Sequence, residues 1–201
     1  MGVRPTRVRR PLVPPDLAAR LPPGQHPTKR WPVLHYGEIA PFDPQTWDFS
    51  VSGEVESPLR FSWDEFHALP RVTISGDLHC VTRWSKLDNS WQGVSAQEIA
   101  ARAGVTDRAR YLLLIGEGGY SANLPIAALD DGVLLAVAHD GEALSPEHGA
   151  PLRAVIPSRY AWKSVKWLRA ITFLAEDRPG FWEDYGYHDN ADPWREERFA
   201  V

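Results

Sequence analysis

Cysteine is almost absent from this sequence, with only Cys80 among 201 residues. One cysteine cannot form an intramolecular disulfide, and it also excludes zinc ribbons and iron–sulfur clusters held by several cysteines of one chain. An excess of one charge is also lacking, because the formal net charge is -4 and the basic residues are scattered. Nucleic acid is therefore not expected as the main partner, since phosphate binding needs a clustered basic face.

Apolar runs are short, and none reaches the length that a membrane-spanning helix needs. The start, MGVRPTRVRRPLVPP, is basic and proline-rich, and no apolar stretch typical of a signal peptide follows it. The cytoplasm is therefore the expected location. The length suits one domain with a substantial core. Nine tryptophans are many for this length, and they indicate either a well-filled core or an aromatic-walled pocket.

The organisation of the chain is read from its prolines and its apolar periodicity. Residues 1–30 carry seven of the 18 prolines, which predicts an extended arm lying on a domain that spans 31–201. The last segment, 177–201, is aromatic and charged, and we expect it to wrap the surface of that domain.

Alternating or continuous apolar residues predict strands at 47–55, 71–74, 111–115, 133–138, 153–156 and 168–174. Capping boxes at Ser62 and Ser95 predict two short helices, the second ended by Gly104, and Asp140-Gly141 predicts a tight turn. Because helices and strands do not alternate strictly, an α+β fold with mixed sheets is expected rather than a doubly wound one.

Cys80 is the first candidate for chemistry. A lone cysteine is most often a small buried apolar residue. This one follows a predicted strand, however, and Arg83 nearby would favour the thiolate that binds soft metals or attacks electrophiles. If the strand continues through Cys80, His79 points to the opposite face. A cysteine hydrolase would then need His139 or His148 as its base.

Three further clusters have both a structural and a functional interpretation. The segment His148 to Arg153 is either a surface turn or an anion site. In the second case Gly149 would let the anion approach the backbone closely, and the guanidinium of Arg153 would bind it with two parallel hydrogen bonds. The segment 162–167 is either a solvated basic face or a phosphate site, in which Lys163 and Lys166 flank a serine. In the segment 118–125, Tyr120 either lines a pocket or packs in the core.

Taken in order, these segments resemble the molybdopterin-binding domain of the sulfite oxidase family, particularly its small bacterial members without a haem domain. The resemblance rests on five stretches that span nearly the whole chain from Trp31: 31–37 (WPVLHYG), 78–85 (LHCVTRWS), 119–125 (GYSANLP), 148–153 (HGAPLR) and 160–168 (YAWKSVKWL). It implies a sulfite-oxidase-type fold that binds one molybdenum-molybdopterin cofactor, without haem.

The resemblance also implies roles for single residues. Cys80 falls on the family's cysteine, whose thiolate binds molybdenum beside the pterin dithiolene. Positions matching the family's contacts to the pterin or its phosphate are His35, Tyr36, His148, Arg153, Ser164, Val165 and Lys166. Tyr120 resembles the active-site tyrosine of sulfite oxidases, and Arg83 would supply charge to an oxyanion.

The implied activity is oxygen-atom transfer to or from a small sulfur- or nitrogen-containing substrate, with electrons exchanged through a separate partner. Sulfite oxidases often have an Asn-Arg pair after the cysteine, whereas here Val81-Thr82 precedes Arg83, so sulfite, a sulfoxide and an N-oxide all stay open. We lean slightly toward reduction. The alternatives are a metal-free cysteine hydrolase and a non-catalytic pterin-binding scaffold, and the sequence leaves the oligomeric state undetermined.

Overall fold

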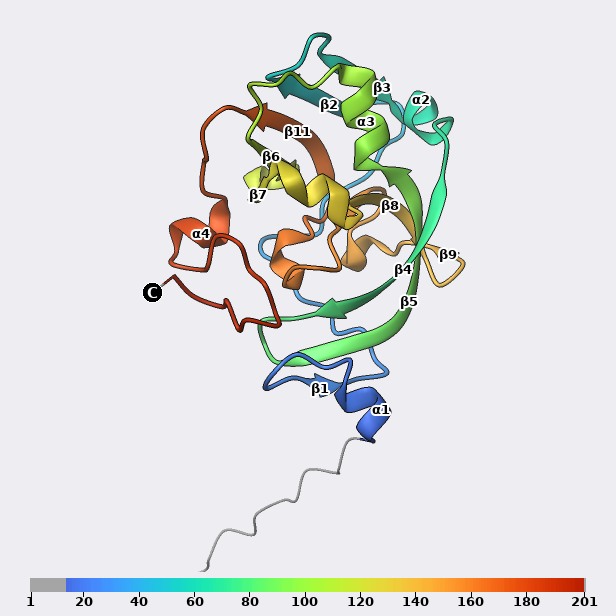
Figure 1. Ribbon diagram of the computed structural model, residues 1–201. Coiled ribbons are helices and arrows are strands. Elements are labelled where there is room, and N and C mark those ends of the chain that lie inside the picture. Colours follow the sequence, from blue (N-terminus) through green and yellow to red (C-terminus); the bar gives the residue numbers. More distant parts are fainter. Residues whose placement is uncertain (1–13, 201) are drawn as a thin grey trace, which may run out of the picture.

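Two β-sheets form the frame of the protein in the computed structural model, which describes residues 14–200 (Figure 1). Sheet A contains six strands, β1 (His26–Pro27), β4 (Val72–His79), β5 (Trp84–Ser95), β8 (Leu134–His139), β9 (Glu142–Ala143) and β10 (Arg153–Val155). Sheet B contains five strands, β2 (Asp48–Gly53), β3 (Leu59–Ser62), β6 (Tyr111–Gly116), β7 (Ser121–Pro125) and β11 (Leu168–Leu174).

The helices are short and connect the strands. The α-helices are α1 (Pro15–Ala18), α2 (Trp63–His67), α3 (Ala96–Ala103) and α4 (Phe181–Asp184). The 3₁₀ segments are η1 (Glu117–Gly119), η2 (Ile126–Asp131), η3 (Pro146–His148) and η4 (Ala161–Lys163). No helix within residues 14–200 has the length and apolar character to cross a membrane.

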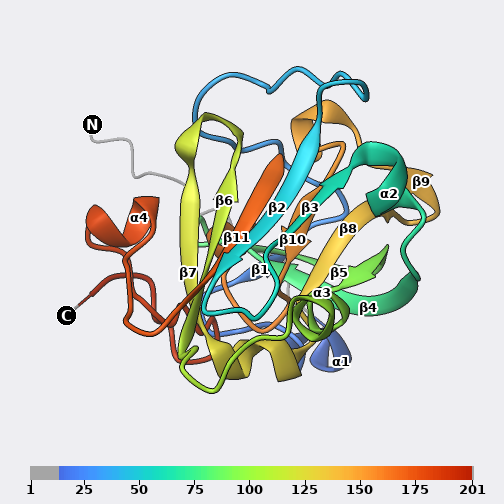
Figure 2. The ribbon, with the colours of Figure 1, turned by 90° about the horizontal axis from the view of Figure 1, so that it is seen from above.

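The long strand β5 organises sheet A. It pairs with β4 along one edge, and with β1 and then β8 along the other. In sheet B the order is β3-β2-β11-β6-β7, and the strands fan out side by side in Figure 2. The pairs β1–β5 and β2–β11 are parallel, and all other pairs are antiparallel. Mixed sheets with short helices are an α+β fold, as expected from the sequence.

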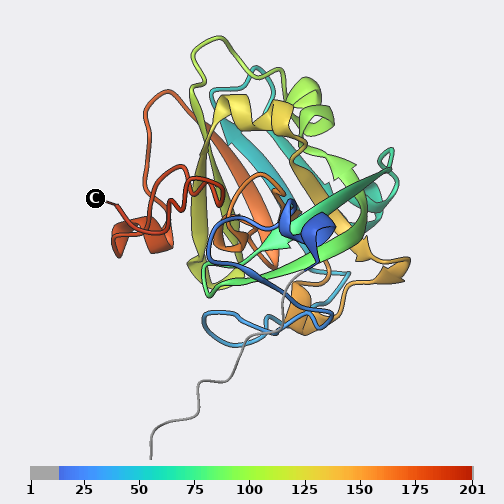
Figure 3. The same ribbon diagram turned by 60° about the horizontal axis from the view of Figure 1, so that its bottom comes forward.

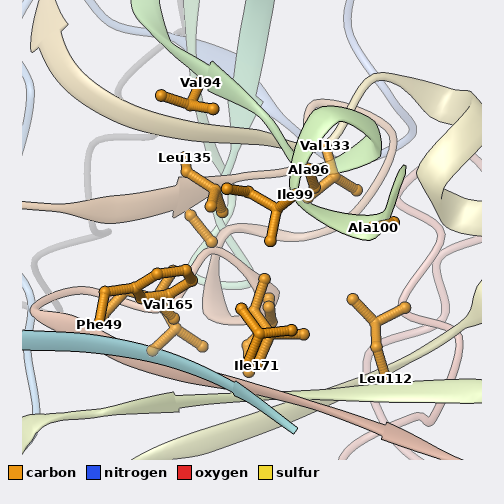
Figure 4. Close-up of a cluster of buried hydrophobic side chains, with 14 of the residues drawn as sticks. Phe49, Val94, Ala96, Ile99, Ala100, Leu112, Val133, Leu135, Val165 and Ile171 are labelled. Atoms are coloured by element: carbon orange, nitrogen blue, oxygen red, sulfur yellow. The ribbon is translucent and has the colours of Figure 1, made fainter. Parts of the chain in front are cut away.

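The two sheets and α3 share the main hydrophobic core. Ile99 of α3 is fully buried, and it lies between Leu135 of sheet A and the side chains of sheet B (Figure 4). Phe49 and Ile171 supply part of that second face and are also fully buried. Side chains of this kind each contribute about 1.5–3 kcal/mol when buried, so this core fixes the scaffold on which the site is built.

The predicted strands correspond to β2, β4, β6, β8, β10 and β11, although β4 runs on to His79. The capping box at Ser62 is formed, whereas at Ser95 only the serine bonds its helix, because Glu98 pairs with Arg102 instead. The turn at Asp140-Gly141 has positive φ at both residues, as a hairpin turn of type I′ requires.

The sequence patterns do not predict β5 or β7, nor the short strands β1, β3 and β9. Much of β5 is polar, so its sequence lacks the apolar run of a buried strand, and its backbone pairing on both edges is what makes it one. The Gly-rich start of the segment 116–125 suggests a loop, and η1 does occupy part of it before β7 begins.

The terminal segments pack against the body. Within the described part of the predicted arm, β1 adds to the edge of β5, and Figure 3 shows the N-terminal segment in blue beside it; residues 1–13 lie outside the described part of the chain. The C-terminal segment does more than cover the surface, because Ala191 and Arg198 are buried and α4 contacts β7.

Candidate cofactor pocket

A pocket of about 300 Å³ opens where the loop 31–36, the end of β4, η4 and the C-terminal segment meet. Its lining is mainly aromatic and includes five of the nine tryptophans, Trp31, Trp84, Trp162, Trp167 and Trp182. Among the residues predicted for a site, the lining contains His35, Tyr36, Cys80, Tyr120, Arg153, Ser164 and Lys166. Segments more than a hundred residues apart in sequence therefore supply one site.

Cys80 stands at the end of β4, in the turn that leads to β5. The turn is closed by two backbone hydrogen bonds, from Cys80 N to Trp84 O (2.9 Å) and from Arg83 N to Cys80 O (3.0 Å). The Cys80 side chain is only 7% exposed, and its sulfur lies 3.1 Å from the Thr82 hydroxyl. The neighbouring His79 is buried outside the pocket lining, where its Nδ1 lies 2.8 Å from Ser85 Oγ.

The electrostatic setting of Cys80 combines burial with nearby donors. Burial raises the pKa of the Cys80 thiol, while the Thr82 hydroxyl and the positive charge of Arg198 act in the opposite direction. A thiol that is buried and not ionised by a base suits a soft metal, which stabilises the thiolate on binding, better than it suits a free nucleophile.

Arg153 forms the cationic side of the pocket together with Lys166. Its guanidinium is buried and donates to three backbone carbonyls, those of His148, Ser164 and Ala154. It also lies 5.3 Å from the ring of Trp31 and forms no ion pair with a described carboxylate. Burial lowers its pKa to about 10, so the group stays charged at neutral pH while its charge lacks an acidic partner.

Lys166 stands beside Arg153 and donates to two carbonyls, Leu34 O at 2.8 Å and Glu147 O at 2.6 Å. Burial, and then the charge of Arg153, lower its pKa to about 7. Gly149 permits this arrangement: its φ is +105°, and a Cβ there would lie 3.0 Å from Lys166 Cβ and 3.2 Å from Arg153 Cβ. The predicted role of Gly149 in close backbone approach thus has a geometric basis.

An aromatic wall lines the pocket, and Val81 of the Cys80 turn packs against part of it. Its members are Tyr36, Tyr120, Trp162, Trp182 and Tyr187. Tyr120 is held in it because its hydroxyl donates to Trp162 O at 2.7 Å. Burial raises the pKa of Tyr120, so its hydroxyl is protonated at neutral pH. Trp162, Trp182 and Tyr187 were not among the predicted site residues, and the high tryptophan count was the one signal for them.

Three predicted site residues are outside the lining. Arg83 has φ +75° in the turn after Cys80, and its guanidinium lies against Gly24 on the N-terminal segment. His148 lies behind the pocket, stacked on Trp31 with 3.8 Å between ring centroids. Val165 is fully buried in the main core, where its backbone carbonyl accepts from Ala154 N.

Lys163 also differs from the pair of phosphate-binding lysines that its segment suggests. It is fully buried and faces away from Lys166, because its Nζ lies 2.6 Å from Glu183 and 2.7 Å from Asn123 Oδ1. Lys163 is the last residue of the 3₁₀ turn η4, whereas Lys166 follows it in irregular backbone before β11, so the two lysines do not share one face of a regular element.

Neither histidine proposed as the base of a cysteine hydrolase reaches Cys80. The Nε2 of His139 lies 2.9 Å from Asn89 Oδ1, and His148 Nδ1 lies 3.0 Å from Ser145 Oγ. Neither residue lines the pocket, and the side-chain partner of the Cys80 sulfur is Thr82. The geometry therefore lacks the nucleophile–base contact that such a hydrolase needs.

The donor set instead fits a metal–pterin cofactor with an anionic tail. Cys80 offers one thiol, and Arg153 and Lys166 offer buried positive charge without a carboxylate partner in hydrogen-bonding reach. Within residues 14–200 no group of three or more His, Cys, Asp or Glu side chains is arranged to hold a metal ion. These features are those of a pocket in which one cysteine would bind a metal carried by an anionic organic group.

Comparisons with known proteins agree with this class. The family model for the oxidoreductase molybdopterin binding domain matches residues 36–182. The chain is 49% identical over 187 residues to the uncharacterized oxidoreductase YuiH of Bacillus subtilis (strain 168), covering 92% of this chain and 94% of the relative. It is 28% identical over 175 residues to the protein-methionine-sulfoxide reductase catalytic subunit MsrP of Campylobacter jejuni, covering 76% of this chain and 59% of that protein.

Among solved structures, the fold is similar to the sulfane dehydrogenase SoxCD from Paracoccus pantotrophus, with a TM-score of 0.62 and 20% identity. That alignment covers 88% of this chain and 56% of the SoxCD chain. The chain belongs to the oxidoreductase molybdopterin binding domain family, of the sulfite oxidase type, and it is a molybdopterin-dependent oxidoreductase.

Proposed function

We propose that this enzyme reduces a small neutral sulfoxide by oxygen-atom transfer, with electrons supplied by a separate carrier. The observation that carries the proposal is the neutral aromatic wall beside Cys80. The cations in the pocket lining, Arg153 and Lys166, belong to the side that we assign to the cofactor phosphate. Arg83, which would serve an anionic substrate, points toward Gly24 instead.

The residues have separate tasks in this proposal. The Cys80 thiolate binds the molybdenum, and Arg153, Lys166 and Ser164 bind the phosphate end of the pterin. When bound, the cofactor supplies the oxygen-atom transfer and the accompanying change in oxidation state. Tyr120 keeps its proton at neutral pH and holds the wall by its hydrogen bond to Trp162 O.

The names of two similar proteins support a sulfoxide as the class of substrate. One is the MsrP subunit already described, named as a methionine-sulfoxide reductase. The other is the putative protein-methionine-sulfoxide reductase subunit YedZ1 of Azospira oryzae, which is 29% identical over 182 residues and covers 88% of this chain and 69% of that protein.

The test assays both directions on one preparation: sulfite with an artificial electron acceptor, and a panel of S- and N-oxides with a reduced dye. We expect sulfoxide reduction to dominate and Arg83→Ala to leave it unchanged. Fast sulfite oxidation with negligible oxide reduction would overturn the proposed direction. Inactivity in both directions of a protein loaded with molybdenum would favour a binding scaffold.

A matched pair of tryptophan variants tests the role of the wall. Trp182→Ala should raise the KM for a sulfoxide about tenfold, which is the usual effect of losing an apolar pocket contact. Trp194→Ala is the control, because Trp194 is 51% exposed and does not line the pocket. Equal KM values in the two variants would show that the wall does not bind substrate.

A further inference from the structure

The turn that carries Cys80 has few supports of its own. It joins β4 to β5 and contains Arg83 at φ +75°, a left-handed conformation that is strained for a residue with a side chain. Such a turn keeps one geometry only when its surroundings hold it. In Figure 1 it lies between the N-terminal segment in blue and the C-terminal segment in red.

The N-terminal segment holds one side of the turn. Gln25 Nε2 donates to Cys80 O at 3.0 Å, and the backbone N of His26 donates to Arg83 O at 3.0 Å. The side-chain Oε1 of Gln25 in turn accepts from Ser85 Oγ at 3.4 Å. Ser85 Oγ also lies 2.8 Å from His79 Nδ1. The buried His79 thereby belongs to the support of the turn.

The C-terminal segment holds the other side through Arg198. This residue is 7% exposed, its Nη1 donates to Val81 O at 2.5 Å, and its guanidinium lies 4.8 Å from the ring of Tyr160. Its Nε and Nη2 are buried and have no hydrogen-bond partner within the described chain. Burying a cation that makes a single hydrogen bond to a carbonyl carries a large desolvation cost. A position of Arg198 on the surface would avoid that cost.

We propose that Gln25 and Arg198 are positioning residues for the metal ligand, which fix the Cys80 turn so that the thiol faces the pocket. Each bonds a carbonyl of the turn, one at Cys80 and one at Val81, and both lie outside the span 36–182 that the family model covers. The two terminal segments thus complete a site whose other residues come from the family domain. The proposal holds for either direction of oxygen transfer.

The first test uses the cofactor-free protein and the fact that Cys80 is its one thiol. Gln25→Ala removes a neutral side chain, so it changes the hold on the turn without changing the charge near the sulfur. Alkylation of Cys80 by a maleimide should become about tenfold faster, because losing a buried hydrogen bond shifts local opening by that amount. A rate equal to that of the parent protein would overturn the proposal.

The second test measures molybdenum per folded chain in the holoenzyme together with the thermal midpoint. Arg198→Ala should lose molybdenum, and Arg198→Lys, which keeps a cationic donor, should recover part of it. Arg195→Ala is the control, because Arg195 is exposed in the same segment and contacts Glu197. A drop in thermal midpoint with molybdenum content unchanged would reduce Arg198 to a structural role. If Arg198→Ala fails to fold, the alkylation rate of Gln25→Ala decides.

Discussion

Replacing Arg153 by alanine should empty the pocket of its cofactor. The guanidinium is buried, its pKa is about 10, and it has no carboxylate within ion-pairing distance in the described chain, so its charge is available to a bound phosphate. Removing one charged partner of a buried anion costs roughly 2–5 kcal/mol. At 1.4 kcal/mol for each factor of ten, the affinity for the pterin should fall between about 30-fold and a few thousandfold.

The assay is the pterin and molybdenum content of purified protein, measured beside the thermal midpoint to exclude misfolding. Arg153→Lys should lie between the parent and Arg153→Ala, because it keeps the charge but not the planar fork. Lys29→Ala is the control, since Lys29 is exposed and does not line the pocket. Equal cofactor content in Arg153→Ala and Lys29→Ala would show that the phosphate end of the pocket is misplaced.

Two further predictions concern buried charge elsewhere in the site. Glu183→Gln should destabilise the fold by about 3–5 kcal/mol, because it leaves the buried Lys163 without its counter-charge. The midpoint of thermal unfolding should fall by roughly 10 °C. The control is Glu98→Gln, in an exposed pair, which should lower the free energy of unfolding by at most about 0.5 kcal/mol. Equal losses of stability in the two variants would refute the role of the buried pair. The affinity of the cofactor-free pocket for sulfate should fall as the pH rises through about 7, the pKa of Lys166, because the neutral amine no longer attracts the anion. Titration calorimetry below and above that pH tests this, and a Lys166→Gln variant with the same pH dependence would contradict it.

The sequence predicts much of the fold because apolar periodicity is local. The strands β6 and β11 are nearly continuous apolar runs, and both were predicted close to their observed ends. The strand β5 was missed because its pairing on both edges, rather than its composition, makes it a strand. Pairing of this kind depends on segments distant in sequence, which a local pattern does not contain.

Part of the site is also predictable from the sequence, because its motifs are local stretches of the chain. The five stretches that resemble the family supply the lining residues Cys80, Tyr120, Arg153 and Lys166. The direction of a side chain within a motif is not encoded by spacing alone: η4 turns Lys163 toward Glu183, and the positive φ of Arg83 takes it out of the lining. Arg198 and Gln25 meet the Cys80 turn only through the packing of the terminal segments.

Every role proposed for the pocket depends on Cys80 binding molybdenum beside a molybdopterin. Elemental analysis of protein produced in a host that makes the cofactor tests it most directly, together with turnover of the Cys80→Ala variant. We expect close to one molybdenum per chain in the parent protein and no turnover in Cys80→Ala, even where some pterin stays bound. A parent protein without molybdenum, or a fully active Cys80→Ala variant, would contradict it.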